Sequence, residues 1–183
     1  MKLDLGCGSR KQDGFTGVDA IAFEGVDIVA DLRKDWSFAE DNSVDEAYCS
    51  HFVEHLTGLE RVHFCNELYR VLKPGAKATL IAPHWSSCRA YGDFTHQWPP
   101  ISEFWFYYLS KEWRLGDPAK NIAPNAPHTD ITYNPQGYNC DFVATWGYII
   151  HNAIQSRNQE AQQFAVNFYK EAVQDIIATL TKR

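Results

Sequence analysis

The feature that most constrains this chain is a short apolar strand pattern that runs straight into two glycines. Residues 3–8 read LDLGCG. Glycines at the end of a strand let the backbone turn tightly and let a ligand approach without meeting a Cβ atom. An acidic residue, Asp19, ends the next predicted strand, where the acid of nucleotide-binding folds accepts hydrogen bonds from ribose hydroxyls. The first two strands are therefore expected to build a nucleoside site.

Short apolar runs continue to alternate with turns as far as residue 83. Apolar residues recur at helical spacing from Leu59 to Leu72, which predicts one helix, and Pro74 with Gly75 ends it. Strands separated by helices or crossovers predict a mostly parallel sheet with the ligand at the carboxyl ends of its strands. The strands predicted in this part span residues 3–5, 15–20, 26–30, 44–49 and 76–82.

A proline-rich and aromatic stretch follows at residues 84–139. Seven of the eight prolines lie between residues 83 and 135, and ten aromatic residues lie within 84–113. A short helix is predicted from Ser102 to Trp113, with Ser102 as its N-cap. We interpret the stretch as an insertion over the ligand edge of the sheet. A small aromatic core without a role in ligand binding explains the presence of any single ring equally well.

The last part of the chain is predicted as strand, helix and strand. The helix spans Asn158–Val173, and the final segment is taken as a strand because its isoleucines and threonine are β-branched. A length of 183 residues favours one domain. Its expected parts are a cofactor-binding half (1–83), the insertion (84–139) and a C-terminal segment (140–183) with strands at 140–151 and 175–180.

Composition excludes several classes of protein. The net charge of −6 disfavours a non-specific nucleic-acid binder, whose surface would be basic. No apolar run approaches the roughly 20 residues of a membrane-spanning helix, and the N-terminus has no apolar signal core, so we expect a cytoplasmic protein without membrane contact. The five cysteines are an odd number without a CxxC pair, which indicates reduced thiols.

The spacing of the glycine loop discriminates between nucleotides. A dinucleotide fingerprint needs a third glycine and an acid about 20 residues on. Here Lys11 occupies the third glycine position, and Asp19 comes only 13 residues after Gly6. That leaves little room for the helix whose N-terminus a pyrophosphate requires. A ligand with ribose and adenine but no phosphate, such as S-adenosylmethionine, fits the loop better than NAD.

Five ordered motifs carry a family resemblance: LDLGCG, GVDA, ADL, DEAYCSHFVEHL and LYRVLKPGAKATLIAP. Together they resemble the class I S-adenosylmethionine-dependent methyltransferases, over about residues 1–83 and more loosely over 92–104. The resemblance implies an α/β fold with a Rossmann-like, mostly parallel sheet of seven strands, the last of them antiparallel. It also implies a methyltransferase whose cofactor is S-adenosyl-L-methionine.

The same resemblance implies a role for the residues that follow each of the first four strands. The first loop would cradle the methionine part, with an acid that braces it or reaches the amino group, and the acid after the second strand would hold the ribose. The acid after the third strand would lie near the adenine amino group, and the residues after the fourth would lie beside the sulfonium. In chain order these residues are Asp4, Gly6, Cys7, Gly8, Asp19, Asp31, Leu32, Ser50 and His51.

Acceptor chemistry is assigned to the insertion. Methyl transfer from a sulfonium is a one-step displacement, so the enzyme mainly supplies orientation and adds a general base only for a hydroxyl or a protonated amine. The unperturbed pKa of a histidine suits such a base, so His96 and His84 are the candidates, and Asp93 is placed to orient His96. A structural hydrogen bond between Asp93 and His96 explains that pair equally well. The expected acceptor is a small molecule or a glycan.

Two other functions compete with this interpretation. Residues 51–55 match the H-x-x-E-H pattern of a zinc hydrolase, with His51 and His55 as ligands, although the motif lies at a strand-to-helix turn rather than inside a helix. A packing role for His55 is the simpler explanation. The second alternative is a non-catalytic module that keeps the nucleoside site and binds a partner through its aromatic surface.

Overall fold

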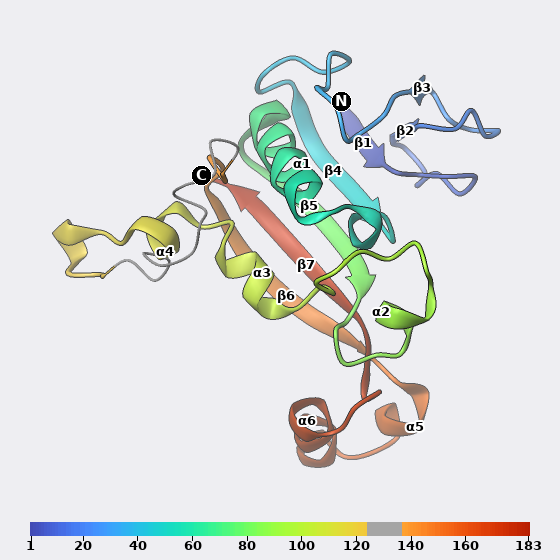
Figure 1. The fold of residues 1–183 in the computed structure, drawn as a ribbon, viewed down its shortest axis with the longest axis vertical. Helices are drawn as coiled ribbons and strands as arrows, with labels where there is room; N and C mark the ends of the chain where they lie inside the picture. Colours follow the sequence, from blue (N-terminus) through green and yellow to red (C-terminus); the bar gives the residue numbers. More distant parts are fainter. Residues whose placement is uncertain (124–136) are drawn as a thin grey trace.

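Seven strands form one mixed sheet in the computed structural model, which describes residues 1–123 and 137–183. The strand order is β3-β2-β1-β4-β5-β7-β6 (Figure 1). The first five strands pair in parallel, and β7 is antiparallel to both of its neighbours, which confirms the predicted fold class. The strands are β1 (Lys2–Leu5), β2 (Thr16–Asp19), β3 (Ile28–Val29), β4 (Val44–Ser50), β5 (Leu72–Pro83), β6 (Phe142–Ile150) and β7 (Val173–Lys182).

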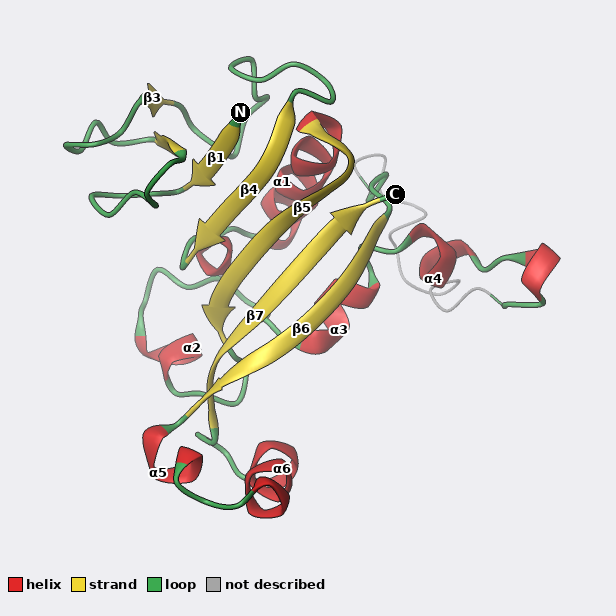
Figure 2. Ribbon diagram, turned by 180° about the vertical axis from the view of Figure 1, so that it is seen from behind, coloured by secondary structure: helices red, strands yellow, loops and turns green. Residues whose placement is uncertain are grey.

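The longest helix, α1 (Gly58–Val71), packs against one face of the sheet. Thr57 and Glu60 form a capping box that starts it, and Leu72 ends it by turning into the extended conformation of β5. Helices α1 and α3 lie on the same face, and the other face is the one that Figure 2 shows in front. The remaining helical segments are η1 (Val53–His55), α2 (Arg89–Gly92), α3 (Glu103–Tyr107), α4 (Lys111–Leu115), η2 (Pro118–Lys120), α5 (Asn152–Gln155) and α6 (Gln159–Phe168).

Apolar side chains fill the space between the helices and the sheet. The largest of those that are almost fully buried are Trp36, Phe64, Phe106 and Phe142. Each aromatic side chain removes 150–250 Å² from water, so these rings dominate the core. Because β1, β4 and β5 are parallel neighbours, their carboxyl ends lie at the same edge of the sheet, and α2 follows the end of β5 (Figure 2).

Two predicted helices are wrong in extent. The helix predicted from Ser102 to Trp113 is divided into α3 and α4, because the hydroxyl of Ser110 accepts the amide of Trp113 and starts a second helix. Ser102 lies at the N-cap position of α3, but its side chain makes no capping bond. The helix predicted to reach Val173 ends at Phe168, because residues 169–172 form a turn with Glu171 at a φ of +67°, and Val173 already pairs with β6.

Strand β5 begins earlier than predicted, at Leu72, and crosses the Pro74-Gly75 pair with a shift in its register against β4. The predicted strands in the C-terminal segment are confirmed as β6 and β7. Across residues 1–123 and 137–183, none of the helices has the length and apolar character needed to cross a bilayer.

Candidate functional site

A cavity of about 570 Å³ opens where β1 and β4 end. The carboxyl ends of adjacent parallel strands are the usual place for a ligand in an α/β sheet. Five residues that the sequence assigned to the cofactor line this cavity, and four others join them. The lining residues are Asp4, Gly6, Cys7, Arg10, Gln12, Tyr48, Ser50, His51 and Arg89.

Both glycines of the loop have left-handed backbone conformations. Gly6 has a φ of +72°, and a Cβ atom there would lie 2.6 Å from the ring of Phe52, so packing as well as backbone geometry demands glycine. Gly8 has a φ of +53°, and a Cβ atom there would meet no atom within 4 Å. The open side of the turn is therefore at Gly8, and the side closed by protein is at Gly6.

Two carboxylates brace this turn. Asp4 is buried and accepts the amide of Gln12, while Oδ2 of Asp19 accepts the amide of Gly8 at 2.9 Å. Burial raises the pKa of Asp4. Burial, assisted by the neighbouring Asp4 and Asp19, also raises the pKa of the Cys7 thiol to about 11, so Cys7 is protonated at neutral pH. Cys7 thus lines the cavity as a neutral side chain and is not activated as a nucleophile.

The remaining residues assigned to adenosine lie outside the lining of the cavity. Asp19 is half-buried at the end of β2, and its Oδ1 accepts the amide of Ile21. Asp31 holds the guanidinium of Arg33 with both oxygens, at 2.8 and 3.1 Å, which lowers the pKa of Asp31. Leu32 is part of the apolar core. The structure thus places the ribose and adenine candidates along the rim that runs from β2 to β3.

His51 follows β4 with a φ of +55°, an uncommon conformation for a side chain with a Cβ. Its Nδ1 lies 3.3 Å from Oε1 of Glu54, and the Glu54 carboxylate raises the pKa of His51. Glu54 itself is almost completely buried. His51 therefore separates the cavity at the glycine loop from a buried acid on η1.

A second pocket of about 560 Å³ adjoins the first and shares His51 and Arg89 with it. Asp93 and His96, two of the acceptor-side candidates, line this second pocket. Nε2 of His96 lies 3.9 Å from Oδ2 of Asp93, too far for a hydrogen bond, and its Nδ1 contacts the carbonyl of Ala90 at 3.4 Å. The remaining lining residues are Glu54, His55, Pro83, Gly92 and Phe94.

The third acceptor-side candidate, His84, lies elsewhere. It is buried and lines neither of the two pockets. Its Nδ1 lies 2.8 Å from the hydroxyl of Ser86, and its Nε2 lies 3.1 Å from Oε1 of Glu103, which also accepts the hydroxyl of Tyr148. The structure therefore brings His96 and Asp93 together, and places His84 in a separate buried network.

The H-x-x-E-H segment does not present the geometry of its sequence motif. It lies at the turn from β4 into the single turn η1, and not inside a helix. Among the described residues, the one group with clustered ligand atoms contains Glu54, His55 and His96, and His51 is not part of it. The pair of ligands expected for a zinc hydrolase, His51 and His55, is thus replaced by a different set.

Sequence reasoning missed four residues of the first cavity: Arg10, Gln12, Tyr48 and Arg89. Arg10 and Gln12 belong to the same loop as the glycines, so their proximity was the only available signal. Tyr48 alternates within β4 toward the cavity, which a strand pattern predicts for side chains two apart. Arg89 comes from α2 and meets Asp175 of β7 at 2.8 Å, a tertiary contact that no local pattern indicates.

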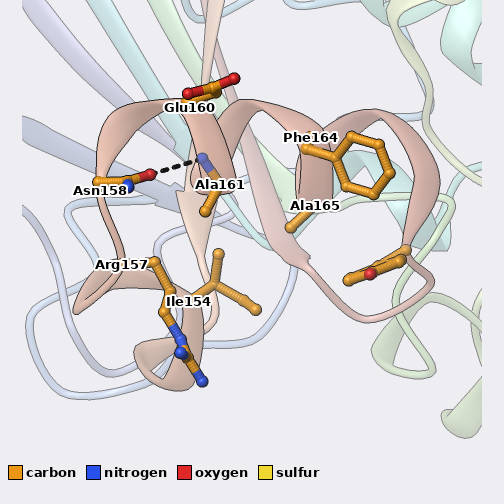
Figure 3. A pocket seen from close by; sticks show the side chains of 8 residues that line it. Ile154, Arg157, Asn158, Glu160, Ala161, Phe164 and Ala165 are labelled. Carbon is orange, nitrogen blue, oxygen red and sulfur yellow. Dashed lines mark hydrogen bonds between the residues drawn. The ribbon is translucent and has the colours of Figure 1, made fainter.

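Another cavity of about 570 Å³ lies at α5 and α6, as Figure 3 shows. The Asn158 side chain is drawn there in a hydrogen bond to the amide of Ala161, which is an N-cap of α6. Ile154, Phe164 and Ala165 are among its apolar lining residues (Figure 3). Its polar groups serve to start a helix, and the strand ends that carry the glycine loop are not among its lining residues.

Comparison with known proteins gives one family match and several solved structures of similar fold. Residues 18–80 match the sequence model of a methyltransferase domain family. No curated protein matches the chain significantly. Among solved structures, a SAM dependent methyltransferase from Archaeoglobus fulgidus aligns with a TM-score of 0.64 at 17% identity, over 99% of this chain and 85% of that one.

Two further structures have the same fold at lower similarity. Geranyl diphosphate C-methyltransferase from Streptomyces coelicolor A3(2), in complex with Mg²⁺, geranyl-S-thiolodiphosphate and S-adenosyl-L-homocysteine, aligns with a TM-score of 0.51 at 14% identity, over 100% of this chain and 69% of that one. A geranyl diphosphate methyltransferase in complex with SAM gives 0.50 at 14% identity, over 100% and 77%. Over residues 18–80 the chain thus matches a methyltransferase domain, and over its whole length it has the fold of a SAM dependent methyltransferase.

Proposed function

We propose that this enzyme methylates a small molecule or a glycan held in the second pocket, next to S-adenosylmethionine in the first. The observation that carries the proposal is the shared wall: His51 and Arg89 line both pockets. A methyl donor and an acceptor must lie in contact for a direct displacement, and adjoining pockets supply that proximity.

The residues of the glycine turn fit the cofactor. Gly8 faces open space, so a ligand can contact its backbone directly. Each oxygen of Asp19 accepts one backbone amide and keeps a second lone pair, with which we propose it binds the ribose hydroxyls. Asp4 holds the loop in place through Gln12, and the exposed Arg10 is suited to the carboxylate of the methionine part. When bound, the cofactor supplies the electrophilic methyl group.

The acceptor side is supported by the chemistry of the second pocket. Phe94 lines it and is 97% exposed, which leaves its ring free to stack on a planar or sugar-like molecule. Arg89 contributes a positive charge that is only partly neutralised by Asp175. Asp93 and His96 add polar groups at the same wall. These features favour a polar acceptor with one apolar face.

Other parts of the proposal come from the sequence alone. We infer a single methyltransferase domain in which residues 84–139 form the acceptor-side insertion, and a cytoplasmic enzyme that does not use nucleic acid as its substrate. Residues 124–136 of that insertion lie outside the described part of the chain.

The experiment is methyl transfer from labelled S-adenosylmethionine across a panel of hydroxyl, amine and thiol acceptors, followed by detection of S-adenosylhomocysteine. The expected result is acceptor-dependent product formation that Phe94→Ala weakens. Binding of the cofactor without turnover on any member of the panel would contradict the proposal and favour the non-catalytic binding module.

A further inference from the structure

Two histidines and a glutamate meet in the second pocket from different parts of the chain. Glu54 and His55 belong to η1, and His96 belongs to the loop after α2. One ligand atom from each lies within 4.8 Å of the others. The rings of His55 and His96 meet edge to face with centroids 4.8 Å apart. Of the three, only Glu54 lies near a residue of the first cavity, His51, and none of them lines that cavity.

The contact at Nδ1 of each histidine determines which ring nitrogen keeps its lone pair. Thr95 donates its hydroxyl proton to Oδ1 of Asp93 at 2.7 Å, so His55 must donate from Nδ1 to the Thr95 oxygen at 2.8 Å. Nδ1 of His96 contacts the carbonyl of Ala90, which can only accept. Both rings therefore keep their lone pair on Nε2, the arrangement that metal-binding histidines adopt.

The Glu54 carboxylate is buried and makes no hydrogen bond within the described part of the chain, which points to a ligand independently of the spacing of the three side chains. Its side chain is 5% exposed, it lines the pocket, and neither oxygen has a hydrogen-bond partner among the described residues. Nδ1 of His51 lies 3.3 Å from Oε1, outside hydrogen-bond geometry. A buried carboxylate without partners is costly, and coordination of a metal is one of the few ways to compensate it.

A buried arginine holds the two segments together. Arg61 donates to the carbonyls of Val53 at 3.1 Å and Gln97 at 3.0 Å, and so joins η1 to the loop that carries His96. The amide of Gln97 also donates to the carbonyl of Glu54 at 2.8 Å. The three side chains thus converge on a fixed backbone frame, as a preorganised ligand site requires.

We propose that Glu54, His55 and His96 bind one divalent transition-metal cation of the zinc and ferrous class, at the wall of the second pocket. Two imidazoles and one carboxylate suit these cations rather than Mg²⁺ or Ca²⁺, which prefer oxygen ligands. Three protein ligands leave at least one coordination position open, as in catalytic rather than structural sites. Ligand bonds of about 2.0–2.2 Å require the atoms to move together from their present spacing.

The proposal changes the role of His96. Its Nε2 lone pair would bind the metal cation and would then not be available to accept a proton from the acceptor. Only one consequence depends on the proposed function: an acceptor oxygen in the second pocket would lie next to the open coordination position. Metal binding itself is tested without any methyl transfer, so the two proposals can fail separately.

The test is metal content after dialysis of the full chain against buffered Zn²⁺, with Cys88→Ser as background because Cys88 is the exposed thiol. One zinc per chain is expected. Glu54→Gln and His96→Ala should each weaken binding by more than the roughly 10–100-fold that loss of an outer partner costs. Thr95→Val should weaken it by about 10–100-fold, and Thr95→Ser should restore it. Co²⁺ in place of zinc should give visible absorption bands that the same variants lose.

The matched control is His151→Asn, which removes an imidazole that caps α5 and keeps an acceptor for the cap. It should bind zinc like the unmodified chain. Folding is checked by thermal unfolding without metal, where Glu54→Gln and His96→Ala should each show one cooperative transition like that of the parent. Zinc should raise the melting temperature of the parent and not of Glu54→Gln. Equal zinc binding by the parent, Glu54→Gln and His96→Ala, or no binding by the parent, would overturn the proposal.

Discussion

The amide of Gly8 donates a hydrogen bond to Oδ2 of Asp19 at 2.9 Å, which ties the glycine turn after β1 to the end of β2. The same carboxylate is our candidate for the ribose hydroxyls. Charge-assisted hydrogen bonds are each worth about 1.5–3 kcal/mol. We therefore expect Asp19→Ala to weaken S-adenosylmethionine binding by about 100-fold or more, which calorimetry can measure.

Asp13→Ala is the matched control for this change. Asp13 is an exposed carboxylate in the same loop, so its loss alters the charge near the site and leaves the turn intact. It should bind the cofactor with nearly unchanged affinity. An Asp19→Ala protein that folds and binds as tightly as the Asp13 variant would place the ribose elsewhere.

Ligand-induced stabilisation should distinguish nucleotides. Residues 6–15, all described, form turns without a helix, so the loop has no helix N-terminus for a pyrophosphate. S-adenosylmethionine and S-adenosylhomocysteine should raise the melting temperature, since a hundredfold excess over Kd contributes about 2.7 kcal/mol to folding. NAD should not. Differential scanning fluorimetry measures this, and a larger shift with NAD would contradict the assignment of the site.

The strands and the long helix could be predicted from the sequence because their signals are local. Alternating burial along β4 and β7, and the capping box of α1, are local signals, and the predicted strands and helix follow them. The prediction failed where a single hydrogen bond divides a helical stretch, as Ser110 does between α3 and α4. The turn at residues 169–172 likewise ends the helix that was predicted to reach Val173.

The candidate site also has a part that the sequence predicts and a part that it does not. The glycine turn was readable because its residues are consecutive. The meeting of His55 with His96 was not, since it depends on tertiary contacts, among them the hydrogen bonds of Arg61 and Thr95. Burial of Glu54 left no trace in the sequence, because a glutamate beside a helix start is normally exposed.

The network around His84 should control stability in acid. Hydrogen bonds from His84 and Tyr148 lower the pKa of Glu103 from 4.5 to about 2. A carboxyl group with a lowered folded-state pKa stabilises fully above its unfolded value, and that contribution is lost as pH falls from about 4.5 toward 2. Glu103→Gln should reduce the free energy of unfolding by about 2 kcal/mol at pH 7.

Urea unfolding at several pH values measures this effect. The difference between the parent and Glu103→Gln should stay constant from pH 7 to about pH 5 and shrink below about pH 4.5. Glu24→Gln, at an exposed position, should show no comparable loss. A difference that grows as the solution becomes more acidic would have the wrong sign for this network.

The final prediction separates acceptor binding from cofactor binding by means of two exposed phenylalanines. Phe94 lines the second pocket and Phe168 lies on α6, where both rings are largely in contact with solvent. If the acceptor stacks on Phe94, Phe94→Ala removes part of the roughly 1.5–3 kcal/mol that burying such a ring provides. The KM for the acceptor should then rise about tenfold, which corresponds to about 1.4 kcal/mol. Phe168→Ala removes a ring that is also largely exposed but lines neither the first cavity nor the second pocket, so its KM should match that of the parent. Cofactor affinity, measured by calorimetry, should be unchanged in both variants because neither ring lines the first cavity. An equal rise in KM for both variants would indicate a general loss of structure, and an unchanged KM in Phe94→Ala would remove this ring from the acceptor site.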